Sequence, residues 1–486
     1  MNTSNLILVA LALPPCGALG IALAHRWPNL REGITLATAV LLFACVAQLL
    51  DPVLAGARPS VTLFEPLPGL PVAFRVEPLG MLFALIASSL WIVNSVYSIG
   101  YMRGNGEQHQ TRFYVCFALA IAAALAIAFA ANLLTLFLFY EMLTLITYPL
   151  VTHHGDAKAK RGGRIYLAIL MGTSIVFLLP AVIYTWHVAG TTDFRAGGIL
   201  PANLAPGAVA VLLALFMFGI GKAALMPFHR WLPAAMVAPT PVSALLHAVA
   251  VVKAGVFSVV KVIVYVFGLD QLVGATDWLI GIAGFTIVAA SVVALRADNL
   301  KRRLAYSTVS QLSYVILAAA MLAPLSVAGA ALHIVAHAFG KITLFFAAGA
   351  IYTVAHKTEV SELDGIGRRM PWTMAAFAIG ALSMVGLPPA AGFVSKWYIV
   401  SGAMAHAQWF ALAVILVSTL LNAGYFLPIL HRAFFRPLSA EAAAHPHGEA
   451  PLPMVVALSA TAAGTLALFF FPDVPLALAR SLVAAP

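Results

Sequence analysis

Charged residues are scarce in this chain of 486 residues. Asp, Glu, Lys and Arg together make up 9% of it, whereas hydrophobic residues make up 62%. Soluble globular domains carry about 25% charged residues, so the composition excludes that class. Strand-like alternation of apolar and polar residues is also missing, which excludes an outer-membrane barrel. The mean hydropathy of +0.98 leaves an all-α polytopic membrane protein as the expected fold, because about 20 apolar residues cross a bilayer as one helix.

Cysteines and an N-terminal basic cluster are likewise lacking. The three cysteines, Cys16, Cys45 and Cys116, fall in apolar segments without CxxC spacing, so neither a disulfide framework nor a cysteine metal site is expected. No basic residue precedes Leu6, and we expect the first apolar segment to be a retained helix, not a cleaved signal peptide. The formal net charge of +10 comes from basic residues spread between apolar segments, which favours orientation in a membrane over nucleic-acid binding.

Long apolar segments fill most of the chain, and we interpret residues 1–486 as one integral membrane domain. The loop at about 51–78 contains β-branched and aromatic residues around a Pro-Gly turn, which predicts a short hairpin. The apolar segments predict fourteen membrane spans, at about 5–24, 33–50, 79–101, 112–131, 132–152, 166–187, 207–227, 240–268, 277–295, 304–323, 325–353, 372–403, 407–430 and 452–471.

The loops between these spans differ in basic charge. One alternating set carries 18 arginines and lysines. The opposite set, with the C-terminal tail, carries only Arg58, Arg75, Arg195 and Arg480. Basic loops remain in the cytoplasm, so both termini are expected on the non-cytoplasmic side.

Two predicted spans are long and interrupted. The seventh runs into GKAALMPFHRWLP, where Pro227 and Pro233 break the helical hydrogen bonds, and the twelfth contains VGLPPAAGFVSKW. Paired interruptions at membrane depth are typical of ion sites in transporters. The alternative, that proline is simply common in membrane helices, explains one break more easily than two. The breaks lie five spans apart, and this odd number predicts an inverted duplication.

Few formally charged residues lie inside the spans. Every arginine, and every carboxylate except Glu141, is expected in a loop. An ionisable group at membrane depth costs several kcal/mol and usually marks an ion path or proton relay. The residues concerned are Glu141, Lys222, Lys253, Lys261, Lys341 and Lys396.

Glu141 lies midway along the fifth span, and Lys222 lies beside the break of the seventh. We expect the two to form an ion pair, because a nearby ammonium holds a buried carboxylate ionised. A static pair that only fixes helix packing is the alternative. A functional pair is favoured, since ionisable residues within membranes usually act in transport.

The eighth span carries three candidates. Lys253 is mid-span, where burial disfavours the charged amine and makes its proton easy to release. His247 is nearer the cytoplasmic end and can pass a proton through its two ring nitrogens. Lys261 stands about two turns further toward the outside, and we expect it to extend to the membrane interface.

The eleventh span carries His333, His337 and Lys341 in HIVAHAFGK. Spacings of four residues place all three on one helical face. Two histidines at this spacing can bind a metal or haem, but no third ligand is apparent, so a polar stripe that conducts water or protons is favoured. Lys396 follows the break of the twelfth span and ends the series.

Four stretches, PFHRWLPAAMVAPTPVSALLHA, FYEMLTLITYPL, HAFGK and GLPPAAGFVSKW, resemble the antiporter-like membrane subunits of multisubunit Na+/H+ antiporters and respiratory complex I. The resemblance covers nearly the whole chain. It implies inverted five-helix repeats at about 112–268 and 277–430, each with a half-channel, in a bacterial inner membrane. It also assigns proton translocation to residues of this chain, with no cofactor or metal: Glu141, Lys222, His247, Lys253, His333, His337, Lys341 and Lys396.

Within this family we expect a subunit of type D from a cation/proton antiporter, with other integral membrane subunits as partners. Lys396 stands where the middle complex I subunit has glutamate, and the chain ends at Pro486 without length for the lateral helix of the distal subunit. A proximal complex I subunit or a membrane-bound hydrogenase subunit remains as the alternative. Any Na+ path is expected in a partner, because the spans offer one carboxylate only.

Three other classes are less consistent with the sequence. A transporter of organic solutes needs a roomy midplane pocket, whereas these polar residues form a string. A structural anchor for a redox enzyme would not need spaced lysines. A membrane-embedded enzyme would need a nucleophile–base pair or phosphate loop, and none is visible, although a redox complex that contains the chain would itself be an enzyme.

Overall fold

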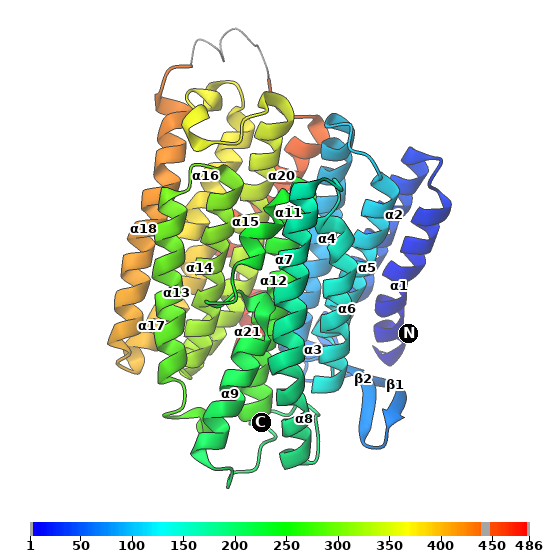
Figure 1. The fold of residues 1–486 in the computed structure, drawn as a ribbon, viewed down its shortest axis with the longest axis vertical. Coiled ribbons are helices and arrows are strands. Elements are labelled where there is room, and N and C mark those ends of the chain that lie inside the picture. The colour runs from blue at the N-terminus through cyan, green and yellow to red at the C-terminus, as the bar shows by residue number, and fades with distance from the viewer. Residues whose placement is uncertain (1–2, 439–447, 484–486) are drawn as a thin grey trace.

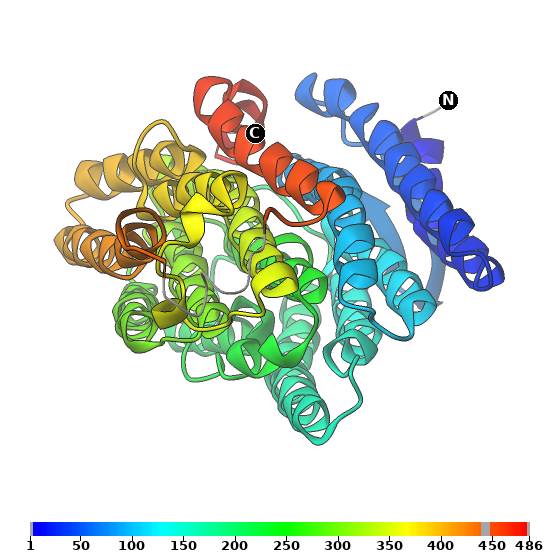
Figure 2. The ribbon, with the colours of Figure 1, turned by 90° about the horizontal axis from the view of Figure 1, so that it is seen from above.

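The computed structural model describes residues 3–438 and 448–483, with the side chain of His247 left out. The chain forms a bundle of helices that run roughly parallel to one another (Figure 1), as predicted for an all-α polytopic membrane protein. Seen from above in Figure 2, the first two helices lie along one edge of the bundle and α18 lies at the opposite edge.

Ten helices in the described ranges are long and apolar enough to cross a membrane. They are α1 (Thr3–Leu23), α2 (Pro28–Ala47) with α3 (Leu50–Leu54), α4 (Pro78–Gly104), α5 (Gln110–Ala128), α6 (Leu133–Val151), α7 (Ala157–Thr173) with α8 (Leu179–Ala189), α13 (Asp277–Arg296), α15 (Pro324–Ala355), α18 (Trp409–Phe435) and α20 (Leu452–Phe470). Each coincides with a predicted span.

The other four predicted spans are also helical, but none of them is a single long and uniformly apolar α-helix. Two are broken. A third contains π-helical turns, and the fourth, α14, carries many hydroxyl and amide side chains. These spans are α9 (Pro206–Gly219) with η2 (Gly221–Ala223), α11 (Thr240–Ala244) with η4 (Leu245–Val249), α12 (Val251–Val262) and η5 (Ile263–Phe267), α14 (Leu300–Ala320), and α16 (Pro371–Val385) with α17 (Ala391–Ala405).

The predicted hairpin is present. Strands β1 (Ser60–Leu67) and β2 (Leu70–Arg75) pair antiparallel. The first and last described residues lie in the same half of the bundle as this hairpin (Figure 1). We call this end the hairpin end, and the opposite end, with loop residues 105–109 and 152–156, the basic end.

The two interruptions occur where the sequence predicts them. Helix α9 ends at Gly219, and the chain then passes through Lys222 and a left-handed Ala224 (φ 57°) before the short helix α10 (Trp231–Ala234). Helix α16 ends at Val385, where Gly386 takes φ 89° and terminates the helix. Glycine tolerates this conformation because it has no Cβ.

Helix α15 lies at the centre of the molecule. Of its most apolar 18-residue stretch, 94% is buried, whereas the corresponding share is 39% for α1 and for α18. A helix enclosed by protein can hold polar side chains on several faces without exposing them to lipid. Three of the predicted proton-carrying residues lie on α15.

One expectation about the loops is wrong. Arg31 and Arg303 lie in the first turns of α2 and α14, because these helices begin earlier than predicted, and both side chains are buried. Arg31 donates to the amide oxygen of Gln110 at 2.7 Å, and Arg303 donates to the carbonyl oxygen of Tyr425 at 2.9 Å. These contacts supply acceptors that water would otherwise provide.

Candidate functional site

Lys222 lies in the break after α9 and is fully buried. Its Nζ donates to the carbonyl oxygen of Tyr140 at 2.8 Å and to Thr144 Oγ1 at 2.6 Å, and it lies 3.3 Å from the centre of the Tyr140 ring. Residues 140 and 144 are one helical turn apart on α6, so they present a single face to the amine. The helix break lets Lys222 reach this face directly.

The predicted ion pair between Glu141 and Lys222 is not formed. Both carboxylate oxygens of Glu141 are buried and have no hydrogen-bond partner among the described residues. Glu141 follows Tyr140 on α6, and successive helical residues point about 100° apart. The amine therefore contacts the face formed by residues 140 and 144, and the carboxylate on the adjoining face lies within electrostatic range of it without a direct hydrogen bond.

Lys253 and His337 form a contact between ionisable groups of the two predicted repeats. Lys253 Nζ lies 2.5 Å from His337 Nδ1, and both residues are buried. Lys253 is on α12, within the first predicted repeat, and His337 is on α15, within the second. A proton can therefore be shared between an amine and an imidazole at this junction.

His333 lies one turn from His337 on α15, with ring centres 6.3 Å apart. Its Nδ1 lies 2.9 Å from Ser395 Oγ, and its Nε2 lies 3.0 Å from Gln311 Oε1. The two imidazoles thus contact different partners and do not converge on one point, unlike two ligands of one metal. Sequence reasoning did not identify Ser395 or Gln311.

Lys396 ends the series at the second break. Its Nζ donates to the carbonyl oxygens of Met384 and Val385, both at 2.9 Å. These are the last carbonyls of α16, where unpaired acceptors and the helix dipole favour a cation. Gln311 Nε2 also donates to the Met384 carbonyl, at 3.4 Å, so one amide side chain connects His333 with the acceptor of Lys396.

Lys341 forms a side branch of this network. Its Nζ donates to Ser307 Oγ at 2.6 Å, and the Tyr425 hydroxyl lies 2.9 Å from the same oxygen. Tyr425 donates to Asn422, whose amide donates to the Met384 carbonyl at 3.4 Å. The polar residues connected in this way are called the relay below: Lys253, His337, His333, Gln311, Ser395, Lys396, Lys341, Ser307, Tyr425 and Asn422.

Lys261 does not extend to the interface as expected. It is fully buried, its Nζ lies 3.1 Å from Glu77 Oε2, and it donates to the carbonyl oxygen of Ala130 at 2.9 Å. Glu77 precedes α4 at the hairpin end and is itself buried, which makes an internal ion pair possible. The remaining candidate, His247, lies in η4, and its side chain is outside the described part of the structure.

Comparisons with known proteins show the family to which the chain belongs. Residues 130–422 match the protein family described as NADH:quinone oxidoreductase/Mrp antiporter, TM. The chain is 32% identical over 459 residues to NADH-quinone oxidoreductase subunit N of Desulforudis audaxviator, which covers 93% of this chain and 90% of that protein. It is also 32% identical to a probable K+/H+ antiporter protein of Rhizobium meliloti, over 68% of this chain and 32% of that protein.

Among solved structures, a chain of the Mrp complex from Dietzia sp. DQ12-45-1b superposes with a TM-score of 0.88. The alignment covers 100% of this chain and 97% of that chain at 21% identity. The two proteins therefore share one fold over their full lengths.

Proposed function

Because the chain belongs to the NADH:quinone oxidoreductase/Mrp antiporter transmembrane family, we propose that it is the proton-translocating subunit of a multisubunit monovalent cation/proton antiporter. The observation that carries the proposal is the 2.5 Å contact between Lys253 and His337. It links two half-channels, one in each inverted repeat, through groups that bind and release protons. The protein works in a bacterial inner membrane, with both termini on the non-cytoplasmic side.

Protons enter from the basic end toward Lys253, and His247 on the same helix assists them. From Lys253 they pass to His337 and His333, and leave beside Lys396 at the second break. The transfers from Lys253 to His337 and from His337 to His333 occur between groups that are hydrogen-bonded or one helical turn apart. Lys341 can bind a further proton next to this route, and its charge then sets how readily a neighbour accepts a proton.

Lys222 and Glu141 control the first half-channel. In the described structure the amine of Lys222 is bonded to α6 through Tyr140 and Thr144, while the Glu141 carboxylate lacks a partner. Closing the distance between amine and carboxylate would neutralise both charges, and separating them would free a positive charge near Lys253. Two buried charges couple by several kcal/mol across such distances, so this movement shifts the proton affinity of the relay.

The partners are other integral membrane subunits, since the relatives are named as subunits of complexes. Any Na+ path belongs to one of these partners. A dehydrated Na+ prefers several oxygen ligands, and the relay offers mainly nitrogen donors.

A redox-driven complex is the second candidate, because the subunit N relative is matched over 90% of its length. In that case the same relay would pump protons with energy from a quinone-reducing or hydrogenase partner. Purification of the intact complex distinguishes the two. Small antiporter subunits identify secondary antiport, whereas iron–sulfur subunits identify redox-driven pumping.

The proton-translocating role is tested by replacing Lys222 or Glu141 with alanine. Membrane vesicles that contain the whole complex are given a pH gradient, and proton flux is followed with a fluorescent dye. We expect either variant to lower the flux roughly tenfold or more, equivalent to at least about 1.4 kcal/mol, with the complex still assembled. Lys160→Ala, at an exposed lysine of α7, is the control. Wild-type flux in both variants would refute the proposal.

A further inference from the structure

A cavity of about 610 Å³ lies at the basic end of the bundle. It is bordered by the loop after α4, the loop after α6, the start of α14 and the end of α15. Its inner wall includes Val237, Ala238 and Pro239, the three residues directly before α11. Helices α11 and α12 continue from this wall to Lys253, so the cavity lies over the entrance to the first half-channel.

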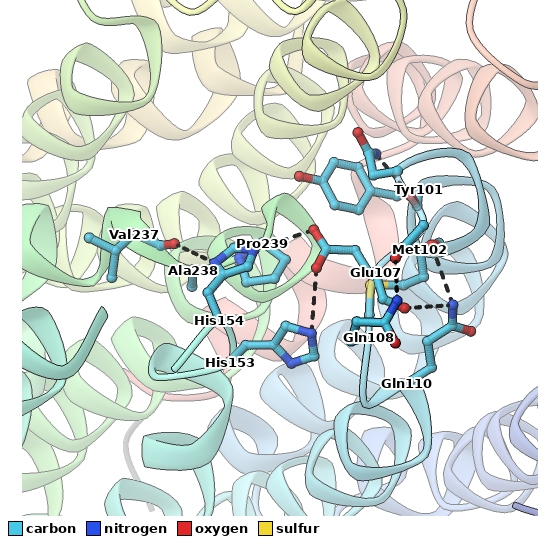
Figure 3. Close-up of polar contacts among 12 residues, drawn as sticks. Tyr101, Met102, Glu107, Gln108, Gln110, His153, His154, Val237, Ala238 and Pro239 are labelled. Carbon is cyan, nitrogen blue, oxygen red and sulfur yellow. Dashed lines mark hydrogen bonds and ion pairs between the residues drawn. The ribbon is translucent and has the colours of Figure 1, made fainter. Parts of the chain in front are cut away.

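A carboxylate with two histidines lies at this cavity (Figure 3). Glu107 Oε1 lies 3.4 Å from His154 Nε2, and Glu107 Oε2 lies 3.6 Å from His153 Nε2. The other ring nitrogen of His154, Nδ1, lies 3.3 Å from the carbonyl oxygen of Val237. His154 therefore connects Glu107 to the inner wall of the cavity, and it is partly exposed, whereas His153 is buried.

The charges around Glu107 and His154 favour the protonated form of the His154 imidazole. Burial by itself would raise the pKa of Glu107, but hydrogen bonds and positive charge from His153 and His154 outweigh it and lower that pKa to about 2. The hydrogen bond to Glu107 raises the pKa of His154, against burial and the positive charge of Lys301. His154 therefore binds its proton more tightly than a free histidine.

Other titratable groups face the same cavity from each neighbouring element. Tyr101 on α4 and Lys301 on α14 are close enough to interact electrostatically with Glu107. Lys301 Nζ is directed to the Ala238 carbonyl oxygen at 2.9 Å. The remaining charged residues that line the cavity are Asp156, Lys158, Arg302 and Lys357.

Polar side chains continue from the cavity toward the relay. Thr240 and Ser243 on α11 and Asn94 on α4 are all fully buried, and Asn94 Nδ2 donates to the Pro241 carbonyl oxygen at 3.3 Å. Thirteen residues separate Thr240 from Lys253, a helical rise of about 20 Å. Thr240, Ser243 and Asn94 line the first turn of this distance, where their hydroxyl and amide groups can order water molecules.

We propose that Glu107 and His154 form the site at which protons enter and leave the relay at the basic end of the molecule. This proposal rests on the proton-translocating function proposed above. A proton from bulk water forms an N–H bond on the His154 imidazole while Glu107 stabilises the cation. That N–H bond then breaks as the proton passes to a water molecule in the cavity, and no electron transfer is involved. His153 and Lys301 position the two groups.

The test compares His154→Asn with His25→Asn, a control at an exposed histidine beyond the end of α1, in vesicles containing the whole complex. We expect His154→Asn to slow proton flux about tenfold near pH 8.5 and much less near pH 6, where free hydronium is more abundant. Added imidazole should restore most of the lost rate at the higher pH. A merely structural histidine would show neither the pH dependence nor the rescue.

Glu107→Gln is the second variant and leaves His154 in place. It should shift the alkaline limb of the flux profile to lower pH, because the imidazolium loses its anionic partner. Wild-type pH profiles in both variants would overturn this proposal. If Lys222→Ala and Glu141→Ala both transport protons normally in the same vesicles, the proton-translocating function proposed above is refuted, so the two failures are distinguishable.

Discussion

At the scale of single residues, the buried lysines are bound mostly by neutral oxygens. Lys222 is held by a carbonyl and a hydroxyl of α6, and Lys396 by the last two carbonyls of α16. Only Lys261 has a carboxylate within 4.0 Å in the described ranges. An amine bound by neutral acceptors gives up its proton more readily than one in an ion pair. This difference separates the relay lysines from Lys261.

We therefore expect the Thr144 hydroxyl to be as important for proton transport as the Lys222 ammonium group that it binds. Thr144→Val keeps the shape of the side chain but removes one of two polar acceptors of the Lys222 amine. Hydrogen bonds to charged groups contribute about 1.5–3 kcal/mol, so we expect proton flux to fall roughly tenfold or more. Thr185→Val is the matched control, because Thr185 Oγ1 bonds to the Ala181 carbonyl of its own helix. Equal flux in the two variants would contradict this role.

The sequence predicts the ionisable members of the site better than their partners. Lysine and histidine are rare at membrane depth, so Lys253, His337 and Lys396 are conspicuous in the sequence. Ser307, Gln311, Ser395, Asn422 and Tyr425 are not, because hydroxyl and amide residues are common in membrane helices. The lack of a hydrogen bond between Glu141 and Lys222 depends on side-chain geometry, which the sequence does not specify.

At the scale of elements, the helix breaks position the lysines. Helix α12 packs directly against the break at η2 through Gly255. A Cβ on Gly255 would lie 2.3 Å from Ala223 N and 2.3 Å from the Lys222 carbonyl carbon. Both are backbone atoms, so a side chain added at Gly255 would push the break, and Lys222 with it, away from α12.

Replacing Gly255 by alanine should displace the break and lower both stability and transport. Overpacking typically costs about 1–3 kcal/mol, and contact with backbone leaves little room to relax. We expect a lower melting temperature of the detergent-solubilised complex and a loss of proton flux. Gly281→Ala on α13 is the control, because a Cβ added at Gly281 would meet no atom within 4 Å. Identical melting temperatures for the two variants would argue against this packing.

Both breaks could be predicted because proline and glycine change backbone chemistry directly. The π-helical turns η4 and η5 could not, since LLHAV and IVYVF contain neither residue. Those turns arise from packing around α12, which is buried along its whole length. Tertiary contacts, and not local propensity, decide the helical hydrogen-bond pattern there.

At the scale of the whole molecule, the basic loops predict the orientation. The hairpin lies at the opposite end of the bundle from the first turn of α7, which carries Lys158 and Lys160. A cysteine in place of Thr62 on β1 should react with a membrane-impermeant thiol reagent in intact cells. A cysteine in place of Lys160 should react only after the membrane is permeabilised. The reverse pattern would overturn the orientation, and labelling of the parent protein accounts for its three native cysteines.

The proton-conducting role of the junction between the two halves is tested most directly by Lys253→Met. Methionine fills a similar volume but cannot share a proton with His337. In vesicles containing the assembled complex, pH-gradient-driven proton flux is compared with that of wild type and of Lys160→Met. The relay predicts a fall of roughly tenfold or more for Lys253→Met and no change for Lys160→Met. Undiminished flux through the assembled Lys253→Met complex would contradict it.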